Sequence, residues 1–162
     1  MASNLTDIAA NDAYRHCLAM LARREHSQQE LRNKMQQHGV SNDVIDSVIS
    51  RLIANNYQSD TRFTEVFCRS RVGRKDGANK IRYQLKQKGI EAALANQFLA
   101  QYSDDFLHNA QDLIIRKAPR GDTNKLFYDI KVKDKITRSL LNKGYDYDTI
   151  RLAFTLLKEE NR

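Results

Sequence analysis

The chain carries one short pattern three times, and this internal repeat limits the folds open to it more than any other feature. Each copy has an aliphatic residue, a second aliphatic residue four positions later, and then a basic residue followed by glycine. The three copies occupy residues 27–40, 77–90 and 132–145. A pattern that recurs about every 50 residues is typical of an array of similar units that pack against their neighbours.

The repeated segment predicts a helix that ends in a tight turn. Aliphatic residues at positions i and i+4 share one face of a helix. A glycine after them suits the left-handed position that ends many helices, and we expect Gly39, Gly89 and Gly144 to adopt it. The residue before each glycine is basic or histidine, which suits the negative end of the helix dipole. At the start of the first copy, Ser27 and Glu30 have the spacing of a capping box.

Amphipathic helices are predicted on both sides of every copy, because apolar residues recur there with a helical period. After the three glycines, the residues that mark these helices are Ile45, Val48, Ile49 and Leu52, then Leu94, Phe98, Leu99 and Tyr102, then Ile150, Ala153, Phe154 and Leu157. Before the three copies, they are Tyr14, Cys17, Leu18 and Leu21, then Phe63, Val66, Phe67 and Ser70, then Phe106, Ala110, Leu113 and Ile114. Asn42 and Asp146 are the expected N-caps of two of these helices.

We therefore predict an all-α protein of three tandem three-helix repeats, forming an elongated array of helix-turn-helix-like units. The repeats are expected at residues 1–57, which include a short N-terminal tail, at 58–102 and at 103–162. Each repeat is small for an independent fold, so it should bury apolar surface against its neighbour. In the third repeat, Pro119 should end the first helix. Residues 119–123 should form a polar connection with an insertion at 120–122, and residues 126–130 should begin the long helix.

Composition supports a helical protein of the cytoplasm. Six glycines and one proline are too few for a turn-rich β fold. Two cysteines, Cys17 and Cys68, cannot form a disulfide framework, and their apolar neighbours favour reduced thiols in the core. The first twelve residues lack the features of a signal peptide, and no run of 18 apolar residues occurs. We expect a cytoplasmic location and no membrane partner.

The net charge of +7 comes from one segment. Residues 69–88 hold eight basic residues and a single acidic one, Asp76, which also gives +7, whereas residues 1–57 are balanced. A basic run on a helix is usually a solvated face. Its concentration in the second repeat favours a binding surface for a polyanion or an acidic partner instead.

The basic segment spans a predicted connection and the helix after it. Gly73 and Gly77 would allow the backbone of a partner to approach this connection closely. Cations beside a helix start could bind phosphates or carboxylates. We expect Arg74 and Lys75 to be exposed, so that reversing both to Glu would weaken binding and leave thermal stability nearly unchanged. The helix should bury Ile81 and Leu85, carry Arg82 and Lys86 beside them, and point Tyr83 outwards.

The sequence contains no motif for catalysis. There is no P-loop or dinucleotide fingerprint, and the glycines follow helices rather than strands. Asp104 and Asp105 suit the first turn of a helix better than a catalytic pair. The histidines, which lack metal-type spacing, are His16, His26, His38 and His108. We expect no enzymatic activity, no cofactor and no metal.

Four ordered segments resemble the signatures of the RecX family, bacterial regulators of the RecA recombinase. They are REHSQQELRNK at 24–34, NYQSDTRF at 56–63, IRYQLKQKGI at 81–90 and LLNKGYDYDTI at 140–150. Together they extend over most of the chain, and their order makes the resemblance more specific than any single segment does. The resemblance implies an all-helical array of three-helix repeats.

The resemblance also implies a function. Family members bind RecA filaments on single-stranded DNA and inhibit the ATPase, strand-exchange and coprotease activities of RecA, which modulates DNA repair and the SOS response. Some also bind DNA directly, and a monomer is the simpler expectation for a protein that binds in a filament groove. The residues expected to contact the partner or nucleic acid are Arg24, Arg32, Arg69, Arg71, Arg74, Lys75, Arg82 and Lys86. Arg32 and Arg82 occupy equivalent repeat positions.

A second interpretation, which assigns the chain to a different class of protein, remains open. Three-helix units with a basic connection are also compatible with an autonomous DNA-binding regulator of the helix-turn-helix kind. Such a protein would bind a specific duplex sequence without RecA, whereas a basic patch alone would bind weakly and with strong salt dependence.

Overall fold

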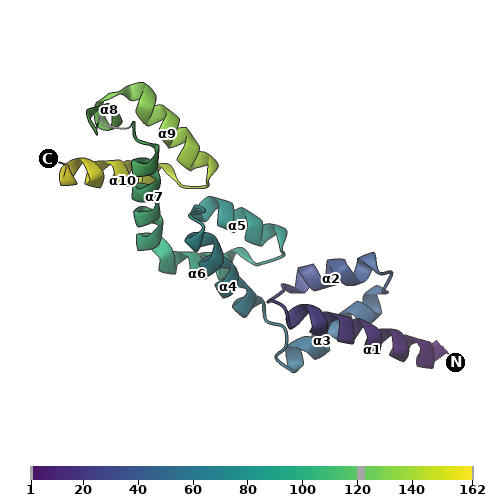
Figure 1. The fold of residues 1–162 in the computed structure, drawn as a ribbon. Coiled ribbons are helices and arrows are strands. Elements are labelled where there is room, and N and C mark those ends of the chain that lie inside the picture. The colour runs from purple at the N-terminus through teal and green to yellow at the C-terminus, as the bar shows by residue number, and fades with distance from the viewer. Residues whose placement is uncertain (1, 120–122, 162) are drawn as a thin grey trace. The chain divides into compact units, whose positions relative to one another are not determined.

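Figure 1 shows the computed structural model, which describes residues 2–119 and 123–161. Within these ranges every element is helical and no strand occurs, as the repeat pattern predicts. The elements are α1 (Ala2–Leu21), α2 (Gln28–Gln37), α3 (Asn42–Ala54), α4 (Asp60–Gly73), α5 (Ala78–Gln87), α6 (Ala92–Leu99), the 3-10 helix η1 (Ala100–Tyr102), α7 (Ser103–Lys117), α8 (Thr123–Tyr128), α9 (Ile130–Asn142) and α10 (Tyr147–Glu160). Residues 120–122, where the sequence suggests an insertion, lie outside the described residues. None of the described helices combines the length and the hydropathy that crossing a membrane requires.

The chain divides into two compact units. The first comprises Met1–Phe67 and Leu85–Leu94, and the second comprises Cys68–Gln84 and Ala95–Arg162. The helices α1, α2 and α3 belong to the first unit, and α7 to α10 belong to the second. The helices α4, α5 and α6 contribute residues to both units. The boundaries of the three repeats drawn from the sequence therefore stay a prediction.

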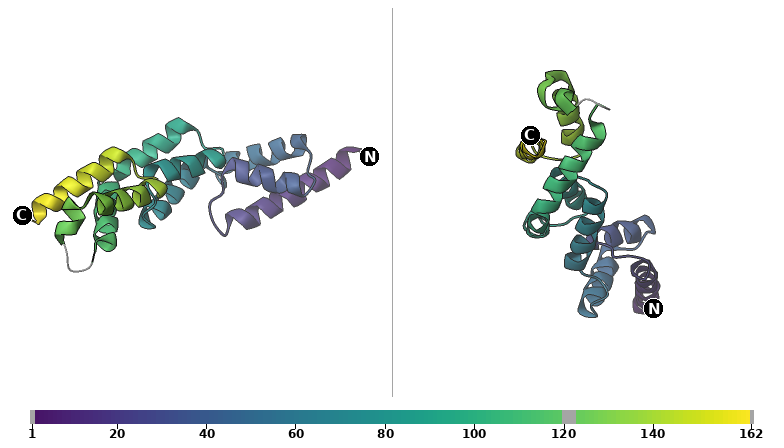
Figure 2. Two further views of the ribbon diagram at one scale, coloured as in Figure 1. Left: turned by 90° about the horizontal axis from the view of Figure 1, so that it is seen from above. Right: turned by 60° about the vertical axis from the view of Figure 1, so that its left-hand side comes forward.

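In the first unit, α1 and α3 lie side by side, and α2 packs on α3 (Figure 2). Every apolar residue that marks α3 in the sequence is buried in the cluster between these helices. Cys17 is fully buried in the same cluster, and Cys68 is fully buried in the second unit. Both thiols are free, and burial raises the pKa of each to about 11, which keeps them protonated. The expectation that both thiols are buried is confirmed.

In the second unit, α7 packs along α10, with α9 against both. The apolar stripes predicted for α7 and α10 are buried in full. Tyr145, in the turn between α9 and α10, lies edge-on to Phe106 of α7, with ring centroids 6.5 Å apart. The core of this unit thus matches the periodicity of the sequence.

The helix ends confirm most of the local signals. Gly39 and Gly89 have φ of +75° and Gly144 has φ of +92°, so all three adopt the left-handed conformation expected after a helix. Ser27 and Glu30 form the predicted capping box, and the Asp146 carboxylate accepts a hydrogen bond from the Thr149 N–H.

Three local expectations need correction. Ser41, not Asn42, is the N-cap of α3. In α4 the apolar stripe lies in a different phase, since Val66 is 43% exposed whereas Phe63, Thr64, Cys68 and Val72 are buried. In the third repeat, residues 126–128 belong to the short helix α8 and not to the long helix. The long helix α9 begins only at Ile130, the last of the residues expected to begin it, because the Asp129 carboxylate accepts from the backbone N–H groups of Lys131 and Val132 and separates α8 from α9.

Candidate functional site

The basic segment begins in α4 and continues through α5. Arg69 and Arg74 are exposed in the second unit, and Lys86 is exposed in the first. Arg71, Lys75 and Arg82 are half-buried. The structure therefore separates the predicted contact residues into side chains that face solvent and side chains that are held within the protein.

Lys75 is held within the second unit. It has φ of +60° in the turn after α4, and its side chain is 20% exposed. Its ammonium pairs with the carboxylate of Asp112 on α7, and this hydrogen bond holds the pKa of Asp112 below its ordinary value. The Lys75 carbonyl accepts a hydrogen bond of 2.9 Å from the Tyr145 hydroxyl. These contacts give Lys75 a structural role, so we now expect its reversal to lower stability.

The buried carboxylate of Asp76 pairs with two more cations. Lys80 lies 2.7 Å from one oxygen of Asp76, and Arg71 lies 3.8 Å from the other. Lys88 pairs in the first unit with Glu30. At least four of the eight basic residues between positions 69 and 88 are thus paired with carboxylates. Two of these carboxylates, Asp112 and Glu30, lie outside the segment, so its surface carries less charge than its sequence indicates.

Arg32 and Arg82 occupy equivalent positions in the structure as well as in the sequence. Arg32 on α2 lies 2.6 Å from the Asp46 carboxylate on α3. Arg82 on α5 donates to the amide oxygen of Asn96 on α6 at 2.9 Å, and to that of Asn79 at 2.7 Å. Each arginine thus reaches a residue 14 positions later. Both arginines stay charged, but the Asp46 carboxylate offsets the charge of Arg32, whereas the two amides that hold Arg82 are neutral.

Arg24 belongs to a contact that joins two repeats within the first unit. Its guanidinium lies 3.0 Å from the Glu30 carboxylate, which also pairs with Lys88 in the turn after α5. Burial alone would raise the pKa of Glu30, but the hydrogen bonds from Arg24 and Lys88 outweigh it and hold this pKa below its ordinary value. A β-carbon added at Gly89 would lie 2.7 Å from the β-carbon of Gln29. We call this contact of the α2 start with the turn after α5 the first junction.

The second unit contains an equivalent contact, which we call the second junction. It joins the start of α5 to the turn after α9. The N–H of Gly77 donates to the Lys143 carbonyl at 2.8 Å, and the N–H of Asn79 donates to the Gly144 carbonyl at 2.9 Å. A β-carbon at Gly77 would lie 2.2 Å from the carbonyl carbon of Gly144.

The second junction corrects two expectations about the connection before α5. The backbone that approaches Gly77 belongs to this chain and not to a partner. Two of the amide groups at the start of α5 already donate within the chain, so we no longer expect this helix start to bind phosphate. At Gly73, by contrast, an added β-carbon would meet nothing within 4 Å.

The sequence interpretation missed the residues that hold these cations. Asp112 and Tyr145 come from other elements, and no local pattern links them to Lys75. Asp46 and Asn96 were within reach of sequence reasoning, because each follows an equivalent arginine by 14 positions. Two histidines also meet, since the rings of His16 and His38 lie edge to face with centroids 5.2 Å apart. Among the described residues, however, no three His, Cys, Asp or Glu form a group suited to a metal.

Comparisons with known proteins identify relatives of this chain. The family model described as RecX, first three-helix domain, matches residues 13–52, and that of RecX, second three-helix domain, matches residues 59–99. A Regulatory protein RecX from Haemophilus influenzae is 36% identical over 137 residues, which cover 84% of this chain and 88% of that protein. A Regulatory protein RecX from Prosthecochloris aestuarii is 33% identical over 150 residues, or 91% of this chain and 94% of the relative. The crystal structure of RecX from Lactobacillus salivarius has the same fold, with a TM-score of 0.84 at 24% identity over 94% of this chain and 98% of that one.

Proposed function

The chain belongs to the RecX family of regulatory proteins, and on this premise we propose that it is a non-enzymatic regulator of the RecA recombinase. It binds the RecA filament on single-stranded DNA and inhibits ATP hydrolysis, strand exchange and coprotease activity, and it thereby modulates DNA repair and the SOS response. Family membership is the observation that carries this proposal, because the relatives match most of the length of the chain.

The exposed cations of the basic segment support a role in binding. Arg74 and Lys86 are exposed, and no ion pair of either side chain occurs among the described residues. Arg82 is held by two neutral amides, so its guanidinium is positioned without losing its charge. A guanidinium fixed in this way pairs well with carboxylates and phosphates, and it loses less rotamer entropy when a partner binds. These three side chains are the first candidates for contact with the filament.

The proposal is tested by RecA-dependent ATP hydrolysis on single-stranded DNA with substoichiometric amounts of this protein. We expect the hydrolysis rate and the filament length to fall. The double variant Arg74→Glu with Lys86→Glu should inhibit less than the wild type. Arg15→Glu, which reverses an exposed arginine of α1, is the matched control and should inhibit normally. Hydrolysis and filament length that do not respond to the protein would contradict the proposal.

The same protein preparations separate this function from that of an autonomous DNA-binding regulator. Binding to duplex DNA without RecA should be weak and should fall steeply with salt, because it would rest on phosphate contacts alone. Tight binding to one duplex sequence at physiological salt would favour the autonomous regulator.

A further inference from the structure

In the first two repeats, an arginine bridges the second helix to the third. Arg32 reaches Asp46, and Arg82 reaches Asn96. Both bridges start at the residue after the first buried aliphatic of the repeated segment, Leu31 or Ile81. Each bridge thus spans the two helices with a long side chain.

The third repeat lacks this bridge. The register that aligns the three glycines places Thr137 of α9 and Arg151 of α10 at the two equivalent positions. Thr137 is too short to cross the gap. Arg151 pairs instead with Asp148 on its own helix, at 3.0 Å. A cavity of about 370 Å³ lies at this place, and Thr137 and Arg151 both line it.

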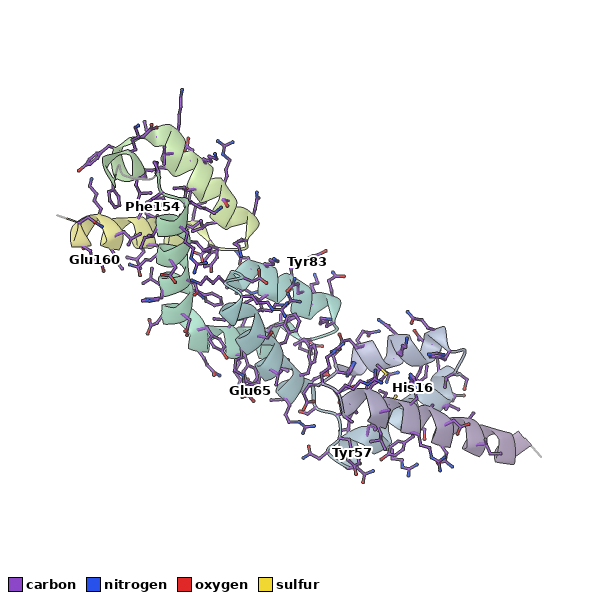
Figure 3. The ribbon with its side chains drawn as sticks, viewed as in Figure 1. His16, Tyr57, Glu65, Tyr83, Phe154 and Glu160 are labelled. Carbon is purple, nitrogen blue, oxygen red and sulfur yellow. The ribbon has the colours of Figure 1, made fainter. Side chains whose placement is uncertain are left out.

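The walls of the cavity are largely aromatic and aliphatic. Phe127 of α8 lines it together with Ile150 and Phe154 of α10. Phe154 lies on the side of α10 that faces α8 and α9 (Figure 3). Tyr147, at the start of α10, also lines the cavity and is 67% exposed. The volume falls in the range of small-ligand pockets, which begins at about 300 Å³.

All charged side chains of the described residues that line the cavity are basic: Lys133, Arg151 and Lys158. The Lys133 ammonium lies 5.4 Å from the centroid of the Phe154 ring, and the Lys158 ammonium lies 4.5 Å from that of Tyr128. A cation is attracted to the face of an aromatic ring. These contacts therefore hold positive charge at the edge of the cavity. Further exposed cations follow along α9, namely Lys131, Lys135 and Arg138.

We propose that this cavity binds a base of single-stranded DNA. An unstacked base presents a flat π face to Tyr147 and Phe127, and its flanking phosphates require the cations around the cavity. An acidic peptide would satisfy the cations but supplies a ring only where it carries an aromatic residue, whereas every nucleotide has a ring beside its phosphate. The bases of a duplex are already stacked on each other. The choice of DNA over RNA rests on the proposed function.

Tyr147→Trp tests the site directly, because the chain has no tryptophan of its own. The titration uses the full chain and a thymidine oligonucleotide, with no RecA present. We expect saturable quenching of the tryptophan fluorescence by this strand. An abasic strand of the same length, a DNA duplex and polyglutamate should not quench it, because none of them supplies an unstacked base.

A binding assay with the same labelled oligonucleotide gives the second readout. Tyr147→Ala should weaken binding about fivefold or more, the factor that corresponds to the lower limit of one stacked base. Tyr57→Ala is the matched control, since Tyr57 is 52% exposed in the connection after α3 and should bind as the wild type does. Tyr147→Trp should bind at least as well as the wild type.

Three results would overturn the proposal. The first is quenching by the abasic strand or by polyglutamate that equals quenching by the thymidine oligonucleotide. The second is quenching by a uridine RNA but not by the thymidine oligonucleotide, and the third is equal affinity of Tyr147→Ala and Tyr57→Ala for the oligonucleotide. Because RecA is absent, the outcome is independent of the ATPase test. A protein that binds the oligonucleotide through Tyr147 but leaves RecA hydrolysis unchanged would retain this site and lose the proposed function.

Discussion

The two junctions have the same position in the repeat and differ in their chemistry. In each, the left-handed glycine of one repeat lies on the start of the second helix of the preceding repeat, Gly89 on Gln29 and Gly144 on Lys80. The first junction is closed by charge, since Glu30 accepts from both Arg24 and Lys88. The second is closed by backbone hydrogen bonds from Gly77 and Asn79.

The difference between the two junctions follows from the residues at two repeat positions. The positions of Glu30 and Lys88 in the first junction are taken by Lys80 and Lys143 in the second. A direct copy of the first junction would place two ammonium groups together, which is unfavourable. Lys80 pairs instead with Asp76, and the Lys143 ammonium lies 3.4 Å from the Lys75 carbonyl. The same repeat geometry therefore accommodates a Glu–Lys pair in the first junction and two lysines in the second. In the second junction, backbone hydrogen bonds replace the ion pair.

The largest expected effect is at Gly77 in the second junction. The added β-carbon of Gly77→Ala would lie 2.2 Å from one backbone atom and 2.3 Å from the next, so the two hydrogen-bonded segments must separate. We expect a loss of about 3 kcal/mol or more in the free energy of unfolding, measured by urea denaturation. Gly73→Ala adds the same methyl group in open space and should change stability by less than about 1 kcal/mol. Equal effects of the two variants would show that the second junction is not closely packed.

Lys75→Glu should have the next largest effect, because it places a carboxylate against Asp112. We expect a loss of about 1–2 kcal/mol, discounted for the partial exposure of Asp112. Arg74→Glu, at the neighbouring exposed position, should change thermal stability by no more than about 0.5 kcal/mol. If the two reversals were equally neutral, Lys75 would belong with the exposed binding residues, as its sequence position first suggested.

Lys88→Met tests the first junction through its charge. The variant keeps an unbranched side chain but removes one of the two cations on Glu30, so we expect a loss of about 1 kcal/mol in thermal or urea unfolding. The loss should shrink in high salt, because screening weakens the ion pair in the wild type. Lys86→Met, an exposed neighbour, is the control and should be nearly neutral. A loss that is independent of salt would indicate packing rather than charge at this junction.

The smallest expected effect is the pH dependence of the first junction. The folded pKa of Glu30 lies below its ordinary value of 4.5, so its contribution is fully present above that value and is lost as pH falls through the folded pKa. Glu30→Gln should therefore flatten the fall in the free energy of unfolding below about pH 5, by less than about 1 kcal/mol, as measured by urea denaturation. Glu91→Gln changes an exposed carboxylate and should leave that slope as it is. If stability falls with pH equally steeply in Glu30→Gln and Glu91→Gln, Glu30 is not an acid-sensitive contact.

The sequence predicts the features of this fold that depend on near neighbours. The glycine turns, the Ser27 capping box and the stripes of α3, α7 and α10 all follow from spacings of a few residues. The phase of α4 was misjudged because its stripe includes Thr64 and Cys68, whereas Val66 and Phe67 are the more hydrophobic choices at first sight. Local hydrophobicity could not show which of the two phases meets the core.

The candidate site was less predictable, because charge counts do not show pairing. The sequence locates the basic segment, but the carboxylates of Asp112 and Glu30 that neutralise parts of it come from distant positions. The cavity of the third repeat was also missed, although the repeat alignment contains its signal. Thr137 stands where Arg32 and Arg82 stand in the other repeats, and a short side chain there leaves space.

Part of the second unit can form its contacts only late in the synthesis of the protein. Ser27 and Glu30 cap α2 with residues that leave the ribosome together with it. The connection between α4 and α5 has local contacts of Asp76 with Arg71 and Lys80, but the Lys75 carbonyl accepts its hydrogen bond from Tyr145, which is 70 positions later. Translation proceeds at about 5–20 residues per second, so this connection waits several seconds for its partner. During that interval the basic segment emerges without the contacts that neutralise and order Lys75.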